Sequence, residues 1–302
     1  MQTVDSPEKS GNIRVLGFSI FYKSFGESKR GTVLCLHGGP TSHDYMLPFS
    51  DLADFGYRIV FYDWLGCGKS ETPTNKTLFT IEHYVEEVEG VRKALSLGKV
   101  HLLGSSTGGL LGIAYALKYQ KNLRSLITFG ATSNVPELYA EIRRLRKQLP
   151  REAQAEIQKY EEIGDYDNPG YGKACEAFYK RYLWRYLCRL PELPSEVSSL
   201  MMLSHAAFRT LWGPDEFNAL GNLRYWNVDE QLTRLRLPVL VTCGRYDEIT
   251  PKLTGNIHRR IKGSKFVIFE KSSHLAMWEE RKRCMAVVRS FMDKIGERGH
   301  HR

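Results

Sequence analysis

The stretch HLLGSSTGGLLGIAYALKYQ, residues 101–120, has the pattern of a buried strand, a tight turn of small residues and a helix. Within it, Gly104, Ser106 and Gly108 match the spacing of a nucleophile elbow, in which a serine occupies a sharp strand-to-helix turn. Small neighbours allow the strained backbone of such a turn, and the helix N-terminus favours negative charge developing there. The stretch therefore predicts a nucleophilic Ser106.

Strand-like and helix-like segments alternate on both sides of this turn. Short apolar runs separated by longer helical periods are typical of a mostly parallel sheet with helices on both faces. The predicted fold class is therefore α/β. The expected strands lie at residues 13–26, as an antiparallel pair, and at 31–39, 57–70 with its turn, 99–105, 123–131, 237–247 and 265–274.

Between residues 133 and 229 the strand-like runs stop and charged amphipathic helical patterns take their place. The α/β pattern then resumes. We therefore expect one core domain built from residues 1–132 and 230–302, with residues 133–229 inserted as a helical cap domain.

A serine nucleophile needs a base, and the base needs an acid that orients it. In an α/β sheet with a nucleophile elbow, these follow in the chain order serine, acid, histidine. Asp247 follows the strand in VLVTCGRYD, and His274 follows the strand in FVIFEKSSH. Because such sheets place their sites beyond the carboxyl ends of strands, we expect Ser106, His274 and Asp247 to form a catalytic triad.

Two backbone N–H groups are needed to stabilise an oxyanion. One is expected from Thr107, directly after the serine, and the other from Gly39 in the sequence His37-Gly-Gly-Pro40 that follows an early strand. The glycines there let the backbone approach a substrate closely.

Composition excludes several other functions. The net charge of +9 comes from scattered basic clusters without a nucleic-acid-binding motif, so no nucleic-acid partner is expected. The sequence contains no run of 18 or more apolar residues, so no membrane-spanning helix is expected. The six cysteines and nine histidines lack metal-ligand spacing, so no metal or cofactor is expected. Without a signal-peptide pattern, the chain is expected to be cytoplasmic.

The motifs HGGP, SHDY, YDWLGCGKS, GSSTGG, GPDEF, GRYDEITP and SSHLAMWEE occur in this order along nearly the whole chain. In this the sequence resembles α/β-hydrolases of the prolyl aminopeptidase (proline iminopeptidase) family, including the tricorn-associated archaeal aminopeptidases. The resemblance implies an α/β-hydrolase fold with a helical cap insertion. It also implies that Glu216, in GPDEF, and Glu248, beside Asp247, bind the free α-amino group of a substrate. Two carboxylates in a partly dry pocket would hold an ammonium by charge-assisted hydrogen bonds.

The sequence departs from the family pattern at three positions. Thr41 follows Pro40 where the family usually has glycine, Thr107 replaces an aromatic residue, and Trp64 replaces the glutamine of the D-Q-x-G-x-G turn. We therefore predict a serine hydrolase that cleaves an amide bond after a small N-terminal residue with a free amine, acting on a small peptide or amide. The alternative is an amidase, esterase or lactonase of small metabolites in a repurposed pocket. A non-hydrolytic binding protein is disfavoured by the intact triad.

Overall fold

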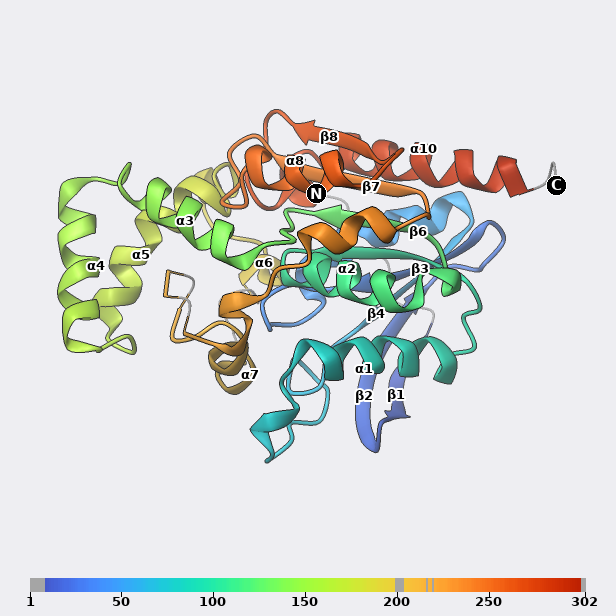
Figure 1. The fold of residues 1–302 in the computed structure, drawn as a ribbon, viewed down its shortest axis with the longest axis horizontal. Coiled ribbons are helices and arrows are strands. Elements are labelled where there is room, and N and C mark those ends of the chain that lie inside the picture. The colour runs from blue at the N-terminus through green and yellow to red at the C-terminus, as the bar shows by residue number, and fades with distance from the viewer. Residues whose placement is uncertain (1–8, 199–203, 216, 219, 300–302) are drawn as a thin grey trace.

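The computed structural model describes residues 9–198, 204–215, 217–218 and 220–299. Their centre is one sheet of eight strands in the order β1-β2-β4-β3-β5-β6-β7-β8 (Figure 1). The β1–β2 and β2–β4 pairs are antiparallel, and every other neighbouring pair is parallel. The strands are β1 (Lys9–Val15), β2 (Phe18–Phe25), β3 (Gly31–Leu36), β4 (Tyr57–Tyr62), β5 (Val100–Ser105), β6 (Leu123–Phe129), β7 (Val239–Gly244) and β8 (Lys265–Phe269).

The sheet is covered on both faces, which explains why its central strands are apolar throughout. One face packs against α1 (Ile81–Ala94), α2 (Thr107–Tyr119) and α8 (Pro251–Arg260), whose apolar residues share one core cluster with the sheet. The other face packs against the 3₁₀ segment η1 (Asp44–Phe55) and α10 (Arg281–Gly299). The prediction of an α/β fold with a mostly parallel sheet is confirmed.

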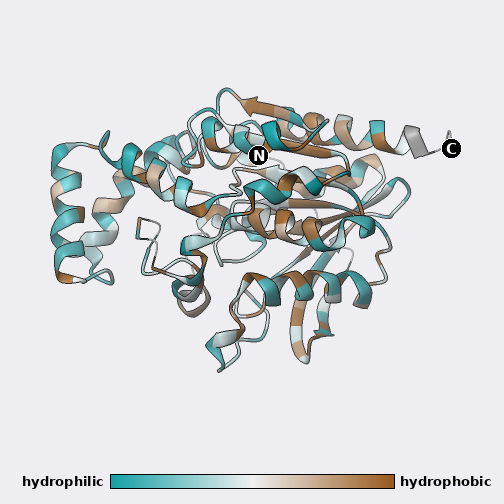
Figure 2. Ribbon diagram, in the orientation of Figure 1, coloured by the Kyte–Doolittle hydropathy of each residue, from teal (hydrophilic) through white to brown (hydrophobic). Residues whose placement is uncertain are grey.

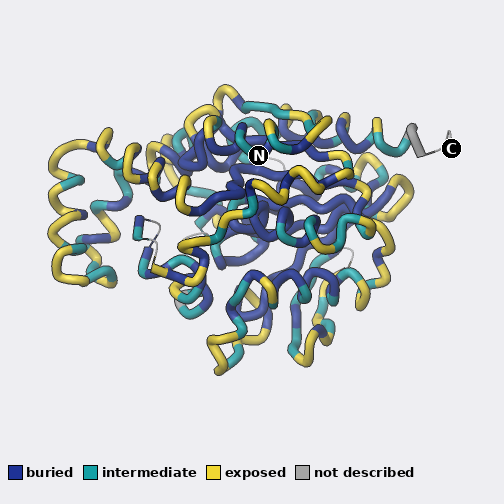
Figure 3. The backbone as a smooth tube through the Cα atoms, viewed as in Figure 1, coloured by how far each residue is buried: buried dark blue, intermediate teal, exposed yellow. Residues whose placement is uncertain are grey.

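Helices occupy the chain between β6 and β7 and extend beyond one end of the sheet (Figure 1). They are α3 (Val135–Arg146), α4 (Arg151–Ile163), α5 (Pro169–Tyr182), the short α6 (Ser195–Ser198) and α7 (His205–Leu211). The outer helix α4 is mostly hydrophilic and exposed, whereas the sheet strands are apolar and buried (Figures 2 and 3). The contrast follows from the position of each element. Helix α4 packs against α5 and otherwise faces solvent, whereas the strands are covered on both faces of the sheet.

Candidate active site

Ser106 lies between β5 and α2 in a conformation that side-chain-bearing residues rarely adopt, with φ 57° and ψ −125°. Its glycine neighbours make this turn possible. A Cβ atom at Gly104 would lie 2.2 Å from the carbonyl oxygen of Gly108, and one at Gly108 would lie 2.2 Å from that of Leu36. The spacing Gly104-x-Ser106-x-Gly108 therefore reflects close backbone packing around an outward-pointing serine.

His274 and Asp247 form a buried pair beyond the carboxyl ends of β8 and β7. The His274 Nδ1 and Asp247 Oδ1 atoms are 2.8 Å apart, and Asp247 Oδ1 also accepts a hydrogen bond from the Ile249 N–H at 2.8 Å. With Nδ1–H donating to the carboxylate, Nε2 of His274 carries the lone pair. Gly130, at φ 48°, leaves room for the pair, because a Cβ atom there would lie 2.6 Å from Asp247 Oδ2.

The structure brings several predicted residues into one cavity of about 530 Å³ beside Ser106. Gly39, His274 and Glu248 line this cavity together with the serine. Asp247 lies behind His274, where it is 2% exposed. A hydroxyl and an imidazole oriented by a carboxylate, the groups that acyl transfer to a serine requires, therefore face the same space as the further carboxylate of Glu248.

The loop that follows β3 is held by His37, which the sequence analysis did not single out. Burial lowers the pKa of His37 to about 4, so its ring is neutral at physiological pH. Nε2 accepts the Trp64 N–H at 3.2 Å, which leaves Nδ1–H to donate to the Gly38 carbonyl at 2.8 Å. Because a trans peptide points its C=O and N–H in opposite directions, this bond turns the Gly39 N–H away from His37.

Trp64, at one of the positions that depart from the family pattern, packs against His37. Its ring stacks on His37 with centroids 4.6 Å apart, and its backbone N–H fixes the tautomer of that histidine. The aromatic residue thus supports the Gly38–Gly39 peptide from behind.

The carbonyl of Gly39 joins three parts of the molecule. It accepts hydrogen bonds from the Thr107 hydroxyl at 2.9 Å and from the Trp212 indole at 3.2 Å. The backbone N–H of Ser204 bonds to the adjacent Pro40 carbonyl at 3.0 Å. The helical segment is therefore tied directly to the glycine loop, a link that the sequence alone gave no signal for because Trp212 lies 173 positions away from Gly39.

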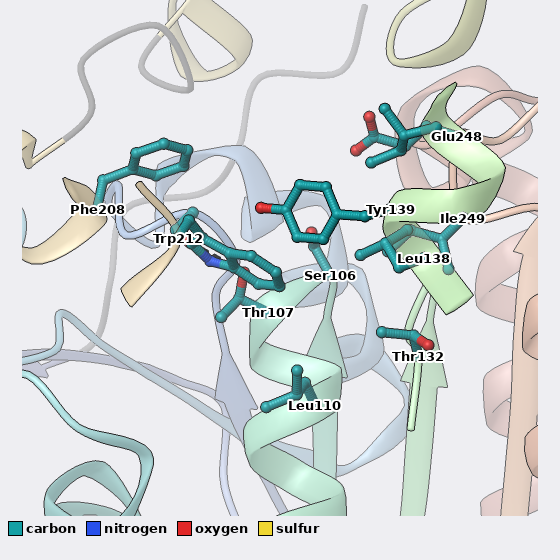
Figure 4. A pocket seen from close by; sticks show the side chains of 12 residues that line it. Ser106, Thr107, Leu110, Thr132, Leu138, Tyr139, Phe208, Trp212, Glu248 and Ile249 are labelled. Atoms are coloured by element: carbon teal, nitrogen blue, oxygen red, sulfur yellow. Dashed lines mark hydrogen bonds between the residues drawn. The ribbon is translucent and has the colours of Figure 1, made fainter. Parts of the chain in front are cut away.

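A second, narrower cavity of about 60 Å³ also borders Ser106 and is mostly apolar (Figure 4). Leu110 and Thr107 reach it from α2, whereas Phe208 and Trp212 reach it from the helical segment. Its other lining residues are Gly39, Thr132, Leu138, Tyr139, Ile142, Glu248 and Ile249.

Glu248 lines both cavities and is only 6% exposed. Glu216, the other glutamate that the resemblance singles out, lies outside the described residues. Its neighbour Asp215 is described: Oδ1 accepts the Phe217 N–H at 2.6 Å, and Oδ2 accepts the Tyr171 hydroxyl at 2.6 Å. This aspartate therefore connects the backbone at Phe217 to Tyr171 of α5.

The loop that carries His274 is bound to the end of α5. The His274 N–H donates to the Tyr182 carbonyl at 3.1 Å. Glu279 accepts hydrogen bonds from the backbone N–H groups of Tyr186, at 2.7 Å, and Ser273, at 2.5 Å. Burial raises the pKa of Glu279 above its usual range. The sequence analysis missed Glu279, because nothing in SSHLAMWEE separates it from an ordinary helix glutamate.

Neither a metal centre nor a membrane span is found in the part of the chain that the structure describes. In those ranges no three His, Cys, Asp or Glu side chains are grouped to hold a metal ion. No helix among the same residues is both long and apolar enough to cross a membrane.

Comparison with known proteins places the chain in a family. The profile described as "alpha/beta hydrolase fold" matches residues 31–281. The proline iminopeptidase of Saccharolobus solfataricus is 41% identical over 292 residues, covering 95% of this chain and 93% of that protein. The crystal structure of VinJ superposes with a TM-score of 0.91 at 29% identity, covering 96% of this chain and 100% of VinJ. The crystal structure of proline iminopeptidase from Mycobacterium smegmatis superposes with a TM-score of 0.86 at 27% identity, covering 96% of this chain and 100% of that protein. The resemblance in the motifs is thereby confirmed: the chain is a hydrolytic enzyme and belongs to the proline iminopeptidase family of α/β-hydrolases.

Proposed function

We propose that the protein is a serine aminopeptidase that removes a small N-terminal residue, proline above all, from a peptide or amide with a free amine. The observation that carries this proposal is the shared cavity of Ser106, His274 and Glu248. A nucleophile, its base and a buried anion in one space suit a substrate that carries both a carbonyl and a nearby ammonium group. Family membership supports the same activity.

In the proposed reaction, His274 Nε2 accepts the hydroxyl proton of Ser106 while the serine oxygen attacks the carbonyl carbon of the amide. Asp247 holds the imidazole through Nδ1 and stabilises the imidazolium that forms. The N–H groups of Gly39 and Thr107 stabilise the oxyanion. The imidazolium then protonates the leaving amine as the C–N bond breaks, and water hydrolyses the acyl-enzyme by the same steps.

The free amine is assigned to Glu248 and Glu216. A carboxylate as buried as Glu248 gains more from an ammonium partner than from water, because little solvent reaches it. A substrate with an acylated amine would leave this carboxylate without its cation, which disfavours binding. The narrow apolar cavity is assigned to the side chain of the N-terminal residue, since a pyrrolidine ring or a short aliphatic group suits its lining.

We also propose that residues 133–229 act as a cap over the core formed by residues 1–132 and 230–302. The hydrogen bonds of Trp212 with Gly39 and of Tyr182 with His274 support this division, because they connect the helical segment to the loops beside Ser106.

We propose the cytoplasm as the compartment. Five of the six cysteines are buried and all six are free thiols, which suits a reducing compartment.

The test is a panel of prolyl-, alanyl- and leucyl-arylamides, each with a free and an N-acetylated amine, together with an aryl acetate. The proposal expects cleavage of the free-amine arylamides and a roughly hundred-fold lower kcat/KM for the acetylated ones, on the order of the loss of a charge-assisted hydrogen bond in a buried site. The variant S106A should abolish turnover. Cleavage of the ester with no response to the amine would leave a serine hydrolase but contradict the aminopeptidase assignment.

A further inference from the structure

The cavity beside Ser106 and His274 is larger than one residue of a substrate needs. Its volume of about 530 Å³ is in the range of pockets that enclose a whole drug-sized ligand. The proposed function already assigns the N-terminal side chain to the narrow cavity that also borders Ser106. The larger cavity is therefore available to the part of a peptide that follows the scissile bond.

Three charged side chains line this cavity, and they lie on two structural elements. Glu248, which follows β7, supplies a carboxylate beside the catalytic histidine, whereas Lys173 reaches the cavity from α5. A second α5 residue of the lining, Glu176, is engaged by Lys180 in an ion pair at 2.6 Å. The described residues offer Lys173 no such ion-pair partner. With the Glu176–Lys180 pair counted as neutral, Lys173 gives the α5 wall of the cavity a net charge of +1.

The geometry of α5 sets the distance between His274 and Lys173. The carbonyl of Tyr182, the last residue of α5, accepts the His274 N–H at 3.1 Å, so this helix end lies at the catalytic histidine. Lys173 lies nine positions earlier, about 14 Å along the helix axis at 1.5 Å per residue. An extended peptide advances by about 3.4 Å per residue. Two to four residues beyond the scissile bond, with the reach of a lysine side chain, therefore span this distance.

We propose that Lys173 binds the C-terminal carboxylate of a short peptide whose N-terminal residue the enzyme removes. This subsite rests on the proposed aminopeptidase function and adds a substrate class to it: zwitterionic peptides of about three to five residues. The ammonium group then lies at Glu248 and the carboxylate at Lys173. The first turn of α5 carries a helix-dipole charge of the same sign as the lysine and adds to the attraction.

The test compares prolyl-alanine peptides of increasing length, each with a free C-terminal carboxylate and with a C-terminal amide. For the wild-type enzyme we expect the acid to be favoured about three-fold in kcat/KM at three to five residues, as for a solvent-accessible ion pair. The preference should decline with added salt. In K173Q the ratio of acid to amide should fall to about one, and in K173E it should fall below one.

K159Q is the matched control, because Lys159 lies on the neighbouring helix α4, is not among the residues of the cavity wall and pairs with Glu156 at 3.3 Å. It removes the same charge from the cap and should keep the wild-type ratio. A wild-type ratio of one at every length, or an unchanged ratio in K173Q, would overturn the subsite while leaving the aminopeptidase intact. If no free-amine peptide or arylamide is cleaved although Ser106 reacts with a fluorophosphonate, the proposed function itself fails.

Discussion

The indole of Trp212 donates a hydrogen bond to the carbonyl of Gly39, at 3.2 Å, and so connects the helical segment to the loop that faces Ser106. The Thr107 hydroxyl donates to the same carbonyl at 2.9 Å. The two donors come from different elements and hold the loop from two sides. Both residues also line the narrow cavity, so the two hydrogen bonds lie beside Ser106.

We expect W212F and T107V each to lower kcat about two- to ten-fold, because each removes one neutral hydrogen bond worth about 0.5–1.5 kcal/mol. The phenyl ring keeps most of the apolar surface, and valine keeps the shape of threonine. Steady-state kinetics on a free-amine arylamide measure the effect. T107S, which retains the hydroxyl, serves as the control. A rise in KM at constant kcat would mean that Trp212 contacts substrate rather than positioning the loop.

A second prediction concerns His37, whose neutral ring bridges the Trp64 N–H and the Gly38 carbonyl. H37F keeps an aromatic ring but leaves both backbone groups without a partner. We expect a loss of about 1–3 kcal/mol in the free energy of unfolding, measured by chemical denaturation. We also expect a lower kcat, since the Gly38–Gly39 peptide is no longer fixed.

The pH dependence of stability provides an independent check on His37. Its pKa is lowered to about 4 in the folded protein from an ordinary value of 6.5, so the unfolded chain binds its proton first. The contribution of His37 to the free energy of unfolding is complete above pH 6.5 and is lost as the pH falls towards 4. H37F should lack this dependence. An equally steep loss in the variant would assign the effect to another group.

The fold and the positions of the proposed triad could be predicted because they depend on local patterns. The apolar runs gave the strands, and Gly104-x-Ser106-x-Gly108 has the glycines that a tight elbow needs. Asp247 and His274 followed from strand ends and chain order. Family membership was also predicted, from the order of the motifs, and is confirmed by the relatives.

The supports around the site could not be predicted, because they are contacts between distant segments. His37 meets Trp64 across 27 positions, and Trp212 meets Gly39 across 173. In the sequence, Trp64 was only a departure from a family pattern, and the structure gives it a stacking partner. Lys173 was one of four lysines in residues 133–229 until the cavity wall distinguished it. Charge and aromaticity alone do not indicate which side chains turn inward.

Glu279 should affect the packing of the helical segment, residues 133–229, against the loop that carries His274. E279Q replaces one carboxylate oxygen by an NH₂ group, which cannot accept a hydrogen bond. Either the Tyr186 N–H or the Ser273 N–H therefore loses its acceptor. We expect faster amide hydrogen exchange at Tyr186 and Ser273, together with a lower kcat/KM.

E280Q is the matched control for this change. Glu280 is adjacent in the chain but accepts from the Lys271 N–H and the Ser272 hydroxyl, which belong to the core. Its substitution should leave exchange at Tyr186 unchanged. If both variants accelerate exchange at Tyr186 equally, the effect is general loosening and Glu279 has no special part in docking the cap.

Two glutamates of α1, Glu87 and Glu89, should have opposite effects on stability as the pH changes. Glu87 is completely buried and accepts only the Leu65 N–H among the hydrogen bonds of the described residues, so burial raises its pKa to about 8. Glu89 is held by the Arg92 guanidinium through both carboxylate oxygens, which lowers its pKa to about 2.

For Glu87, the folded pKa lies above the ordinary value of 4.5, so the unfolded chain loses its proton first as the pH rises. The stabilisation is complete below pH 4.5 and declines up to about pH 8, by at most about 1.4 kcal/mol per pH unit. E87Q removes this decline, so its stability relative to the wild type should rise between pH 5 and 8.

For Glu89 the sign is reversed: its contribution to the free energy of unfolding is present above pH 4.5 and is lost as the pH falls towards 2. E89Q should therefore be less stable than the wild type at pH 7 and approach it in acid. Urea denaturation of the three proteins across this pH range measures both slopes, and parallel curves for E87Q and the wild type would show that Glu87 is already ionised in the folded protein.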